Sequence, residues 1–250
     1  MRHHRGPTPL VHSTVYSVAR GAPLGYREGM TDKPLWGAVD DWIARELQLS
    51  DPVLDSALAD SEKAGLPPIA VTAAQGRFLQ LLVLVSGARR ILEIGTLGGF
   101  STIYMARALP DGGRLTSLEI SELNASVARA NIERAGLAGR VEIRVAPAVE
   151  SLKALERQGE QFDLVFVDAD KKSNKTYLDA AVRMSHRGTV IVVDNVVRDG
   201  AVVDDANRSD DIEGIRAMMT ALGGMRNLTS TALQTVGGKG YDGFVIARVE

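Results

Sequence analysis

Residues 91–110 read ILEIGTLGGFSTIYMARALP and change character twice along their length. An apolar run with one acid, Glu93, comes first and is typical of a buried strand. A glycine-rich turn follows, and apolar residues then recur at the spacing of a helix that stops at Pro110. A strand, a glycine turn and a helix in this order are typical of proteins that bind a nucleotide-like cofactor.

The same alternation of strand and helix continues downstream. Strands are predicted at 90–95, 113–120, 140–146, 162–170 and 189–196, and helices at 100–110, 121–136, 148–159, 175–188 and 212–223. Two further strand-like runs, 228–236 and 241–249, are joined by GGKG, which predicts a hairpin at one edge. We therefore expect an α/β fold, with a Rossmann-like doubly wound, mostly parallel sheet, helices on both faces and an antiparallel C-terminal hairpin.

Upstream of this alternation the sequence predicts extra helices. Apolar residues recur at helical spacing in three segments between Leu35 and Gly87, one of them preceded by the candidate caps Ser50 and Asp51. Residues 1–29 differ, because they are basic, rich in Gly and Pro, and without periodicity. We expect a flexible N-terminal extension over 1–29 and a single domain over 30–250.

Length, charge and cysteine usage exclude several classes of protein. A chain of 250 residues suits one α/β domain, and its formal net charge of -2 gives no electrostatic basis for binding nucleic acid. No apolar run reaches the roughly 18 residues of a membrane helix, and residues 1–29 lack the apolar core of a signal peptide. The absence of cysteine excludes disulfides and thiolate chemistry. We expect a cytoplasmic protein that binds neither nucleic acid nor membrane.

Two acids near the glycine turn bear on the identity of the cofactor. Glu119 ends the second predicted strand, where an acid binds ribose hydroxyls, which suits NAD and S-adenosylmethionine equally. A carboxylate at Glu93 would oppose a pyrophosphate but suits the ammonium of a methionine moiety, directly or through water. The alternative for Glu93 is an N-cap or loop hydrogen bond. We therefore favour S-adenosylmethionine over NAD.

Four segments resemble, in order, the metal-dependent, S-adenosylmethionine-dependent O-methyltransferases, the family that includes caffeoyl-CoA and catechol O-methyltransferases. They are LEIGTLGGFSTIYMARALPDGGRLTSLEI (92–120), VFVDADKKSNKTYLD (165–179), IVVDNVVRDGAVVD (191–204) and GGKGYDGFVIA (237–247). The resemblance runs from about Leu35 to the C-terminus and excludes residues 1–29. It implies a homodimer that acts on a small hydroxylated molecule.

The resemblance also implies roles for individual residues. The cofactor would be bound by Val71, Glu93, Gly95, Thr96, Ser101, Glu119, Ala148 and Asp168. Lys171 would act as the general base, with Asp168 as a second catalytic residue. Asp168, Asp194 and Asn195 would hold a divalent metal.

The residues themselves agree with a metal site. Neighbouring carboxylates at strand ends repel one another unless a cation offsets them. Asp168, Asp194 and Asn195 offer oxygen ligands, which suit a hard cation, Mg²⁺ first, with Mn²⁺ or Ca²⁺ as alternatives. The competing interpretations are that the aspartates only cap loops and that Lys171 is a surface lysine.

These features predict an enzyme that moves a methyl group from S-adenosylmethionine to a hydroxyl of a small phenolic or catechol-like acceptor. The alternative is an NAD-linked oxidoreductase of Rossmann type, which explains the glycine turn and Glu119 but gives VDADK, VDN and Glu93 no role. A nucleic-acid methyltransferase is a further alternative, against which the net charge argues. A catalytically silent binding protein is another, against which the intact metal and base positions argue.

Overall fold

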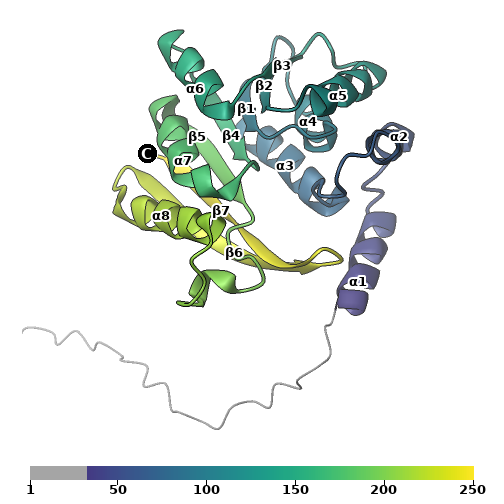
Figure 1. Cartoon of the computed structure of the whole chain (residues 1–250). Helices are drawn as coiled ribbons and strands as arrows, with labels where there is room; N and C mark the ends of the chain where they lie inside the picture. Colours follow the sequence, from purple (N-terminus) through teal and green to yellow (C-terminus); the bar gives the residue numbers. More distant parts are fainter. Residues whose placement is uncertain (1–32) are drawn as a thin grey trace, which may run out of the picture. The chain divides into compact units, whose positions relative to one another are not determined.

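A seven-stranded sheet organises residues 33–250, the part of the chain that the computed structural model describes. Its strands are β1 Arg90–Ile94, β2 Arg114–Glu119, β3 Val141–Val145, β4 Phe162–Val167, β5 Ser185–Asp194, β6 Leu228–Gly237 and β7 Gly240–Val249. They lie in the order β3-β2-β1-β4-β5-β7-β6 (Figure 1). Strands β1 to β5 pair in parallel, and β7 runs antiparallel to both β5 and β6. The predicted mostly parallel sheet with a C-terminal hairpin is confirmed.

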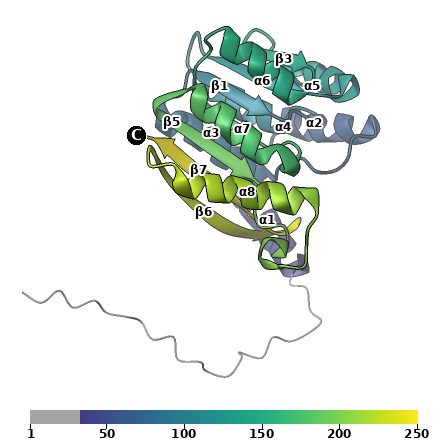
Figure 2. The same cartoon turned by 60° about the vertical axis from the view of Figure 1, so that its left-hand side comes forward.

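Helices cover both faces of this sheet. They are α1 Lys33–Glu46, α2 Pro52–Lys63, α3 Ala73–Ser86, α4 Phe100–Arg107, α5 Glu122–Arg134, α6 Ala148–Arg157, α7 Asn174–Arg183 and α8 Asp210–Gly224, with short 3-10 turns η1 Lys171–Ser173 and η2 Ala201–Val203. Helices α6, α7 and α8 lie on one face (Figure 2), while α2 to α5 contribute to the core on the other. The doubly wound arrangement and the extra N-terminal helices are therefore as predicted. None of the helices between residues 33 and 250 is both long and apolar enough to cross a membrane.

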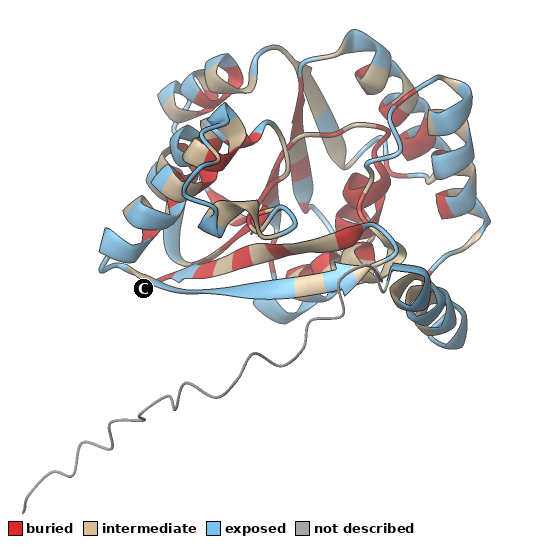
Figure 3. Ribbon diagram, turned by 60° about the horizontal axis from the view of Figure 1, so that its bottom comes forward, coloured by how far each residue is buried: buried red, intermediate tan, exposed pale blue. Residues whose placement is uncertain are grey.

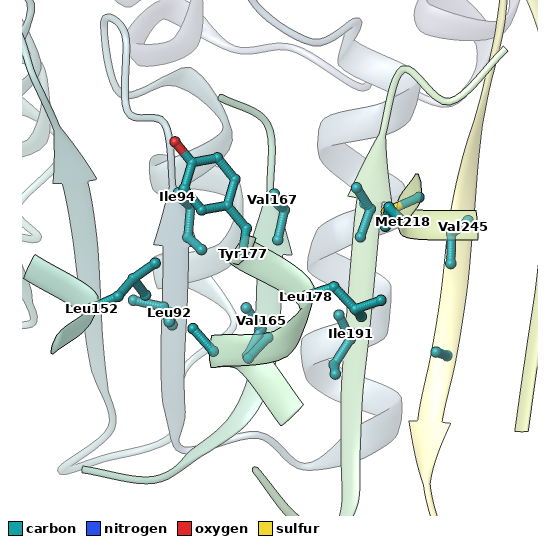
Figure 4. Packing of buried hydrophobic residues seen from close by; sticks show 14 of the residues in the cluster. Leu92, Ile94, Leu152, Val165, Val167, Tyr177, Leu178, Ile191, Met218 and Val245 are labelled. Carbon is teal, nitrogen blue, oxygen red and sulfur yellow. The ribbon is translucent and has the colours of Figure 1, made fainter. Parts of the chain in front are cut away.

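The central strands are buried on both faces, which explains why they read as continuous apolar runs. In β1, Leu92 and Ile94 join the core under α6, α7 and α8 (Figure 4). Ile91 points to the opposite core, under α2 to α5. The alternation of side chains along a strand therefore also places Glu93 on the α2–α5 side.

Helix α2 shows how sequence sets an element boundary. Asp51 is its N-cap, and the carboxylate accepts hydrogen bonds from the backbone N–H groups of Val53 and Leu54. Pro52 occupies the first helical position, where its missing N–H costs nothing. Of the two candidate caps, Asp51 is thus correct, whereas the Ser50 hydroxyl donates to Asp55.

The helix predicted to end at Gly188 is wrong in its last turn. Helix α7 ends at Arg183, and β5 already begins at Ser185. The Met184 carbonyl accepts from the Phe162 N–H, and the Ser185 hydroxyl donates to the last turn of the helix. Pairing with β4 therefore overrides helical periodicity, and Gly188 (φ +97°) lies at an irregularity in the ladder.

Candidate functional site

The glycine turn after β1 requires glycine at its first position. Gly95 adopts φ +104°, and a Cβ placed there would lie 2.3 Å from the carbonyl oxygen of Asp168 at the end of β4. Any side chain would therefore clash with backbone as well as strain the turn. Beyond it, Gly99 is the N-cap residue of α4, and its left-handed backbone (φ +83°) leads directly into the helix.

Glu119 fixes this turn from the end of β2. One carboxylate oxygen accepts from the Leu97 N–H at 2.9 Å, and the other accepts from the N–H groups of Ile120 and Ser121. A carboxylate offers about four acceptor positions, so capacity for another donor remains. A ribose hydroxyl is a group that this position can bind.

Glu93 lies deeper than the sequence suggests. It is fully buried, and its carboxylate accepts hydrogen bonds from the hydroxyls of Ser101, Thr102 and Ser117 at 2.5 to 2.7 Å. Burial raises the pKa of Glu93 to about 7, although the three hydroxyls oppose the shift. The Glu93 carboxyl group therefore lies behind Ser101. This position applies both to the predicted role beside the methionine ammonium and to the alternative of an N-cap or loop hydrogen bond.

A cavity of about 780 Å³ opens beside this turn, at the carboxyl ends of the parallel strands. We call it the glycine-turn cavity. Of the residues predicted to bind the cofactor, it is lined by Val71, Gly95, Thr96, Ser101, Glu119, Ala148 and Asp168. Glu93 does not line it, and reaches it only through its partner Ser101. The cavity therefore brings together all of the predicted cofactor-binding residues except Glu93.

Two carboxylates end the neighbouring strands β4 and β5 and form what we call the acid cluster, Asp168 and Asp194. Asp194 is only 5% exposed, and its pKa is raised to about 7 by burial and then by the negative charge of Asp168. Lys171, itself buried, places its Nζ 2.8 Å from an Asp168 oxygen. Asn195 follows in the left-handed region (φ +60°). The predicted metal and base residues thus lie at adjacent strand ends.

A second cavity, of about 1060 Å³, lies beside the β6–β7 hairpin, and we call it the hairpin cavity. Its walls come from α1, α3, the loop after β5, the start of α8 and the hairpin itself. Phe78 and Phe244 line it as a tilted pair with ring centroids 5.1 Å apart. It shares with the glycine-turn cavity the residues Ile69, Lys172, Asn195, Arg198 and Asp211. Two ligands, one in each cavity, would therefore meet beside these shared residues.

Several residues of the hairpin cavity were missed from the sequence. Lys239 occupies the tight hairpin loop, and burial lowers its pKa while both carboxylates of the acid cluster oppose that shift. Gln75 donates to Asp194 across the sheet edge. The pattern Thr72-Ala-Ala-Gln75 is a capping-box signature that the sequence does offer. Nothing local marks Phe78 or Lys239.

Comparisons with known proteins agree with this architecture. The family model described as O-methyltransferase matches residues 49–229. A Mycobacterium tuberculosis protein named catechol O-methyltransferase is 48% identical over 221 residues, which is 88% of this chain and 99% of that protein. An O-methyltransferase from Bacillus cereus in complex with SAH gives a TM-score of 0.86 at 47% identity, over 87% of this chain and 100% of that one. TomG from Streptomyces achromogenes, an O-methyltransferase solved with SAM, gives 0.85 at 42% identity, over 88% and 99%.

Proposed function

The chain belongs to the O-methyltransferase family, and we propose that it transfers a methyl group from S-adenosylmethionine to a hydroxyl of a small phenolic or catechol-like acceptor. The observation that carries this proposal is the wall shared by the two cavities, which lies beside two carboxylates and a buried lysine. The names of the relatives, with catechol, SAH and SAM in them, support the acceptor class and the cofactor. The NAD-linked oxidoreductase alternative has no support among these relatives.

The cofactor is proposed to occupy the glycine-turn cavity. Glu119 retains acceptor capacity for the ribose hydroxyls, and Ala148 at the start of α6 borders the adenine end. Gly95, Thr96 and Val71 provide close backbone approach, while the remaining cofactor residues Ser101 and Asp168 complete the wall. Glu93 would influence the methionine ammonium through the Ser101 hydroxyl, since it lies behind that side chain.

A divalent cation fits the acid cluster on chemical grounds. Within residues 33–250 no group of three or more His, Cys, Asp or Glu converges, so the donors are two carboxylates and the amide oxygen of Asn195. Two close carboxylates repel each other, and even with Lys171 beside Asp168 and Lys239 nearby, burial and the charge of Asp168 raise the pKa of Asp194 to about 7. An all-oxygen donor set suits Mg²⁺, and accommodates Mn²⁺ or Ca²⁺. When bound there, a cation supplies Lewis-acid stabilisation of an acceptor oxyanion.

The chain's own residues would position and deprotonate the acceptor. Phe78 and Phe244 offer an apolar floor for an aromatic ring beside the acid cluster. Transfer would break the S–CH₃ bond as the O–CH₃ bond forms and leave the demethylated cofactor, and the Nζ of Lys171, in its deprotonated form, would take the hydroxyl proton. Asp168, 2.8 Å from that Nζ, holds the lysine in place. Alignment of oxygen, carbon and sulfur supplies the remaining acceleration.

A methyl-transfer assay over a panel of catechols and monophenols, with products identified by mass spectrometry, tests the proposal. We expect methylated catechols with Mg²⁺ present. SAH at about 100 times its dissociation constant should stabilise the fold by roughly 2.7 kcal/mol, whereas NAD should not. Larger stabilisation by NAD, or no methylated product from any member of the panel, would overturn the assignment.

We also propose that the chain forms a homodimer. Apolar side chains are exposed on α1, α3 and the edge strand β6, which is largely solvent-facing (Figure 3): Leu35, Val39, Trp42, Leu81, Leu84, Val85, Leu233 and Val236. Helix α1 contacts both α3 and β6, so these surfaces adjoin. Exposed apolar area of this kind marks interaction sites. Sedimentation should give a dimer that Trp42→Glu or Leu84→Glu weakens; a monomer at all concentrations would contradict it.

Residues 1–29 lie outside the described part of the chain, and we propose that they are dispensable for folding. The compact unit Asp32–Glu250 supports treating residues 30–250 as the domain. A chain starting at Met30 should keep a cooperative melt. If it melts normally but loses turnover, residues 1–29 belong to the active site instead. A cytoplasmic location stays a prediction, testable by fractionation.

A further inference from the structure

One side chain connects the acid cluster to the wall of the glycine-turn cavity. Gln75, in the first turn of α3, donates from Nε2 to an Asp194 oxygen at 3.3 Å. Its Oε1 accepts from the Thr72 N–H at 3.1 Å. The amide orientation is set by both partners at once, because the N–H group needs an acceptor and the carboxylate needs a donor.

The far end of this connection is the backbone of Thr72, which lines the hairpin cavity and follows Val71 of the glycine-turn cavity. Thr72 is the N-cap of α3, and its hydroxyl accepts from the Gln75 N–H to complete a capping box. Val71, the preceding residue, is buried and lines the glycine-turn cavity. The Val71–Thr72 peptide group is thus one hydrogen bond from Gln75, and Gln75 is one hydrogen bond from Asp194.

The near end of the connection fixes the orientation of Asp194. Its Oδ1 accepts from the backbone N–H of Asn195 at 2.9 Å, and its Oδ2 accepts from Gln75. A carboxylate with a donor on each oxygen is held in one plane. Groups that hold a metal ligand in this way commonly change metal affinity 10- to 100-fold when they are removed.

We propose that Gln75 is a positioning residue that orients Asp194 for the divalent cation and couples cation binding to cofactor binding through the Val71–Thr72 wall. The inference rests on the proposed function, since it needs both ligands. Coupling between two sites is reciprocal, so each ligand must tighten the other by the same factor.

Calorimetry on the full chain without acceptor measures this coupling directly. The dissociation constant of SAH is determined with and without Mg²⁺, and that of Mg²⁺ with and without SAH. We compare the native chain with Gln75→Leu, which loses both amide bonds, and with Gln75→Glu, which keeps the acceptor for Thr72 but cannot donate to Asp194. Thr72→Ala is the matched control, because it weakens the capping box and leaves the Gln75–Asp194 bond in place.

We expect Mg²⁺ to tighten SAH about tenfold in the native chain and by a clearly smaller factor in Gln75→Leu, where only the direct route through Asp168 remains. Gln75→Leu should also weaken Mg²⁺ by about 10- to 100-fold. Thr72→Ala should melt at a lower temperature yet keep the tenfold coupling. Gln75→Glu adds a carboxylate beside Asp194 that can itself bind Mg²⁺, so Gln75→Leu is the deciding variant.

Three results would overturn the inference: native coupling near one, full coupling in Gln75→Leu, or equal loss of coupling in Thr72→Ala. The last would mean that loosening of α3, rather than the amide bond, carries the effect. Failure of the native chain to bind Mg²⁺ or SAH at all would instead remove the proposed function, and this inference with it.

Discussion

The two cavities are assembled from the chain in different ways. The glycine-turn cavity takes its principal residues from the ends of successive parallel strands, such as Gly95 after β1, Glu119 in β2 and Asp168 after β4. Parallel pairing brings those ends to one edge of the sheet whatever the side chains are. The residues that line this cavity follow from topology together with short local motifs.

The hairpin cavity has no such common edge. Phe78 comes from α3, Asp211 from α8 and Lys239 from the β6–β7 loop, and they meet because helices and hairpin pack around the sheet. Its shape is therefore sensitive to side chains distant in sequence. We infer that the glycine-turn cavity is determined by the sheet topology, whereas the hairpin cavity is determined by side chains on the helices and the hairpin that pack around the sheet. Substitutions can test this difference.

The largest expected effect comes from Asp194, whose neighbour Asn195 lines both cavities. Asp194→Ala should lower kcat by about 10³-fold or more, because loss of metal stabilisation of an oxyanion is worth several kcal/mol. SAH affinity without metal should change little, since Glu119 and the glycine turn are untouched. Steady-state kinetics with calorimetry checks both. Chelator should reproduce the defect in the native chain.

Full activity in excess chelator, with no metal detected by elemental analysis, would remove the metal mechanism. If Asp194→Ala instead abolishes SAH binding, the two cavities do not act separately. The acid cluster would then have to be explained by loop structure, such as the Asn195 N–H bond to Asp194.

A smaller effect is expected inside the wall of the glycine-turn cavity, at Glu93. Its pKa is raised from 4.5 to about 7, so the folded state holds the proton more tightly than the unfolded state. The native stability should therefore fall as pH rises from about 4.5 to about 7, by about 3 kcal/mol, and then level off. Glu93→Gln does not titrate and should gain that amount over the native chain across the same window.

Urea unfolding of the ligand-free proteins at pH 5 to 8 measures the difference, in which other titrations largely cancel. The variant should bind SAH more weakly if Glu93 assists the methionine ammonium through Ser101. A stability difference that is constant with pH would show that Glu93 is not protonated on folding.

The sequence predicted the first cavity much better than the second. Apolar runs, glycine turns and acids at strand ends are local patterns, so Gly95, Glu119 and Asp168 could be placed at one end of a mostly parallel sheet, although the order of its strands was not predicted. The contacts of Gln75 with Asp194 and of Phe78 with Phe244 join residues far apart in sequence, and no local rule reports them. The apolar run predicted a buried strand around Glu93, but not that its carboxylate would lie behind Ser101 rather than in the cavity.

In the hairpin cavity, Phe78→Leu should raise the KM for a catechol about 3- to 10-fold, because an aromatic pair between the catechol ring and Phe78 is worth about 0.5–1.5 kcal/mol beyond its buried area. Leucine keeps the apolar volume, so the melting temperature should change little. SAH affinity should be unaffected. Initial-rate kinetics over the acceptor panel checks this, and an equal loss of SAH affinity would contradict separate construction of the cavities.

The smallest effect is expected at His186, at the start of β5 and so at the opposite end of that strand from Asp194. Its Nε2 lies 2.8 Å from Asp163, and hydrogen bonds to the Arg187 carbonyl and to Asp163 raise the pKa of His186. Burial alone would raise the pKa of Asp163, but the N–H groups of Arg89 and Arg90 together with His186 lower it.

A raised histidine pKa contributes stability that is complete below about 6.5, its unfolded value, and is lost as pH rises through the folded value. The lowered pKa of Asp163 contributes above about 3.8 and is lost as pH falls through its folded value. His186→Gln should therefore cost most near pH 5, by at most about 1 kcal/mol because the pair is partly exposed, and almost nothing above pH 8. Turnover and SAH affinity should match the native chain at every pH. A loss of turnover in this variant at unchanged stability would show that the amino ends of the strands influence both cavities. The effects of the other substitutions could then no longer be explained by two cavities that are assembled from different parts of the chain.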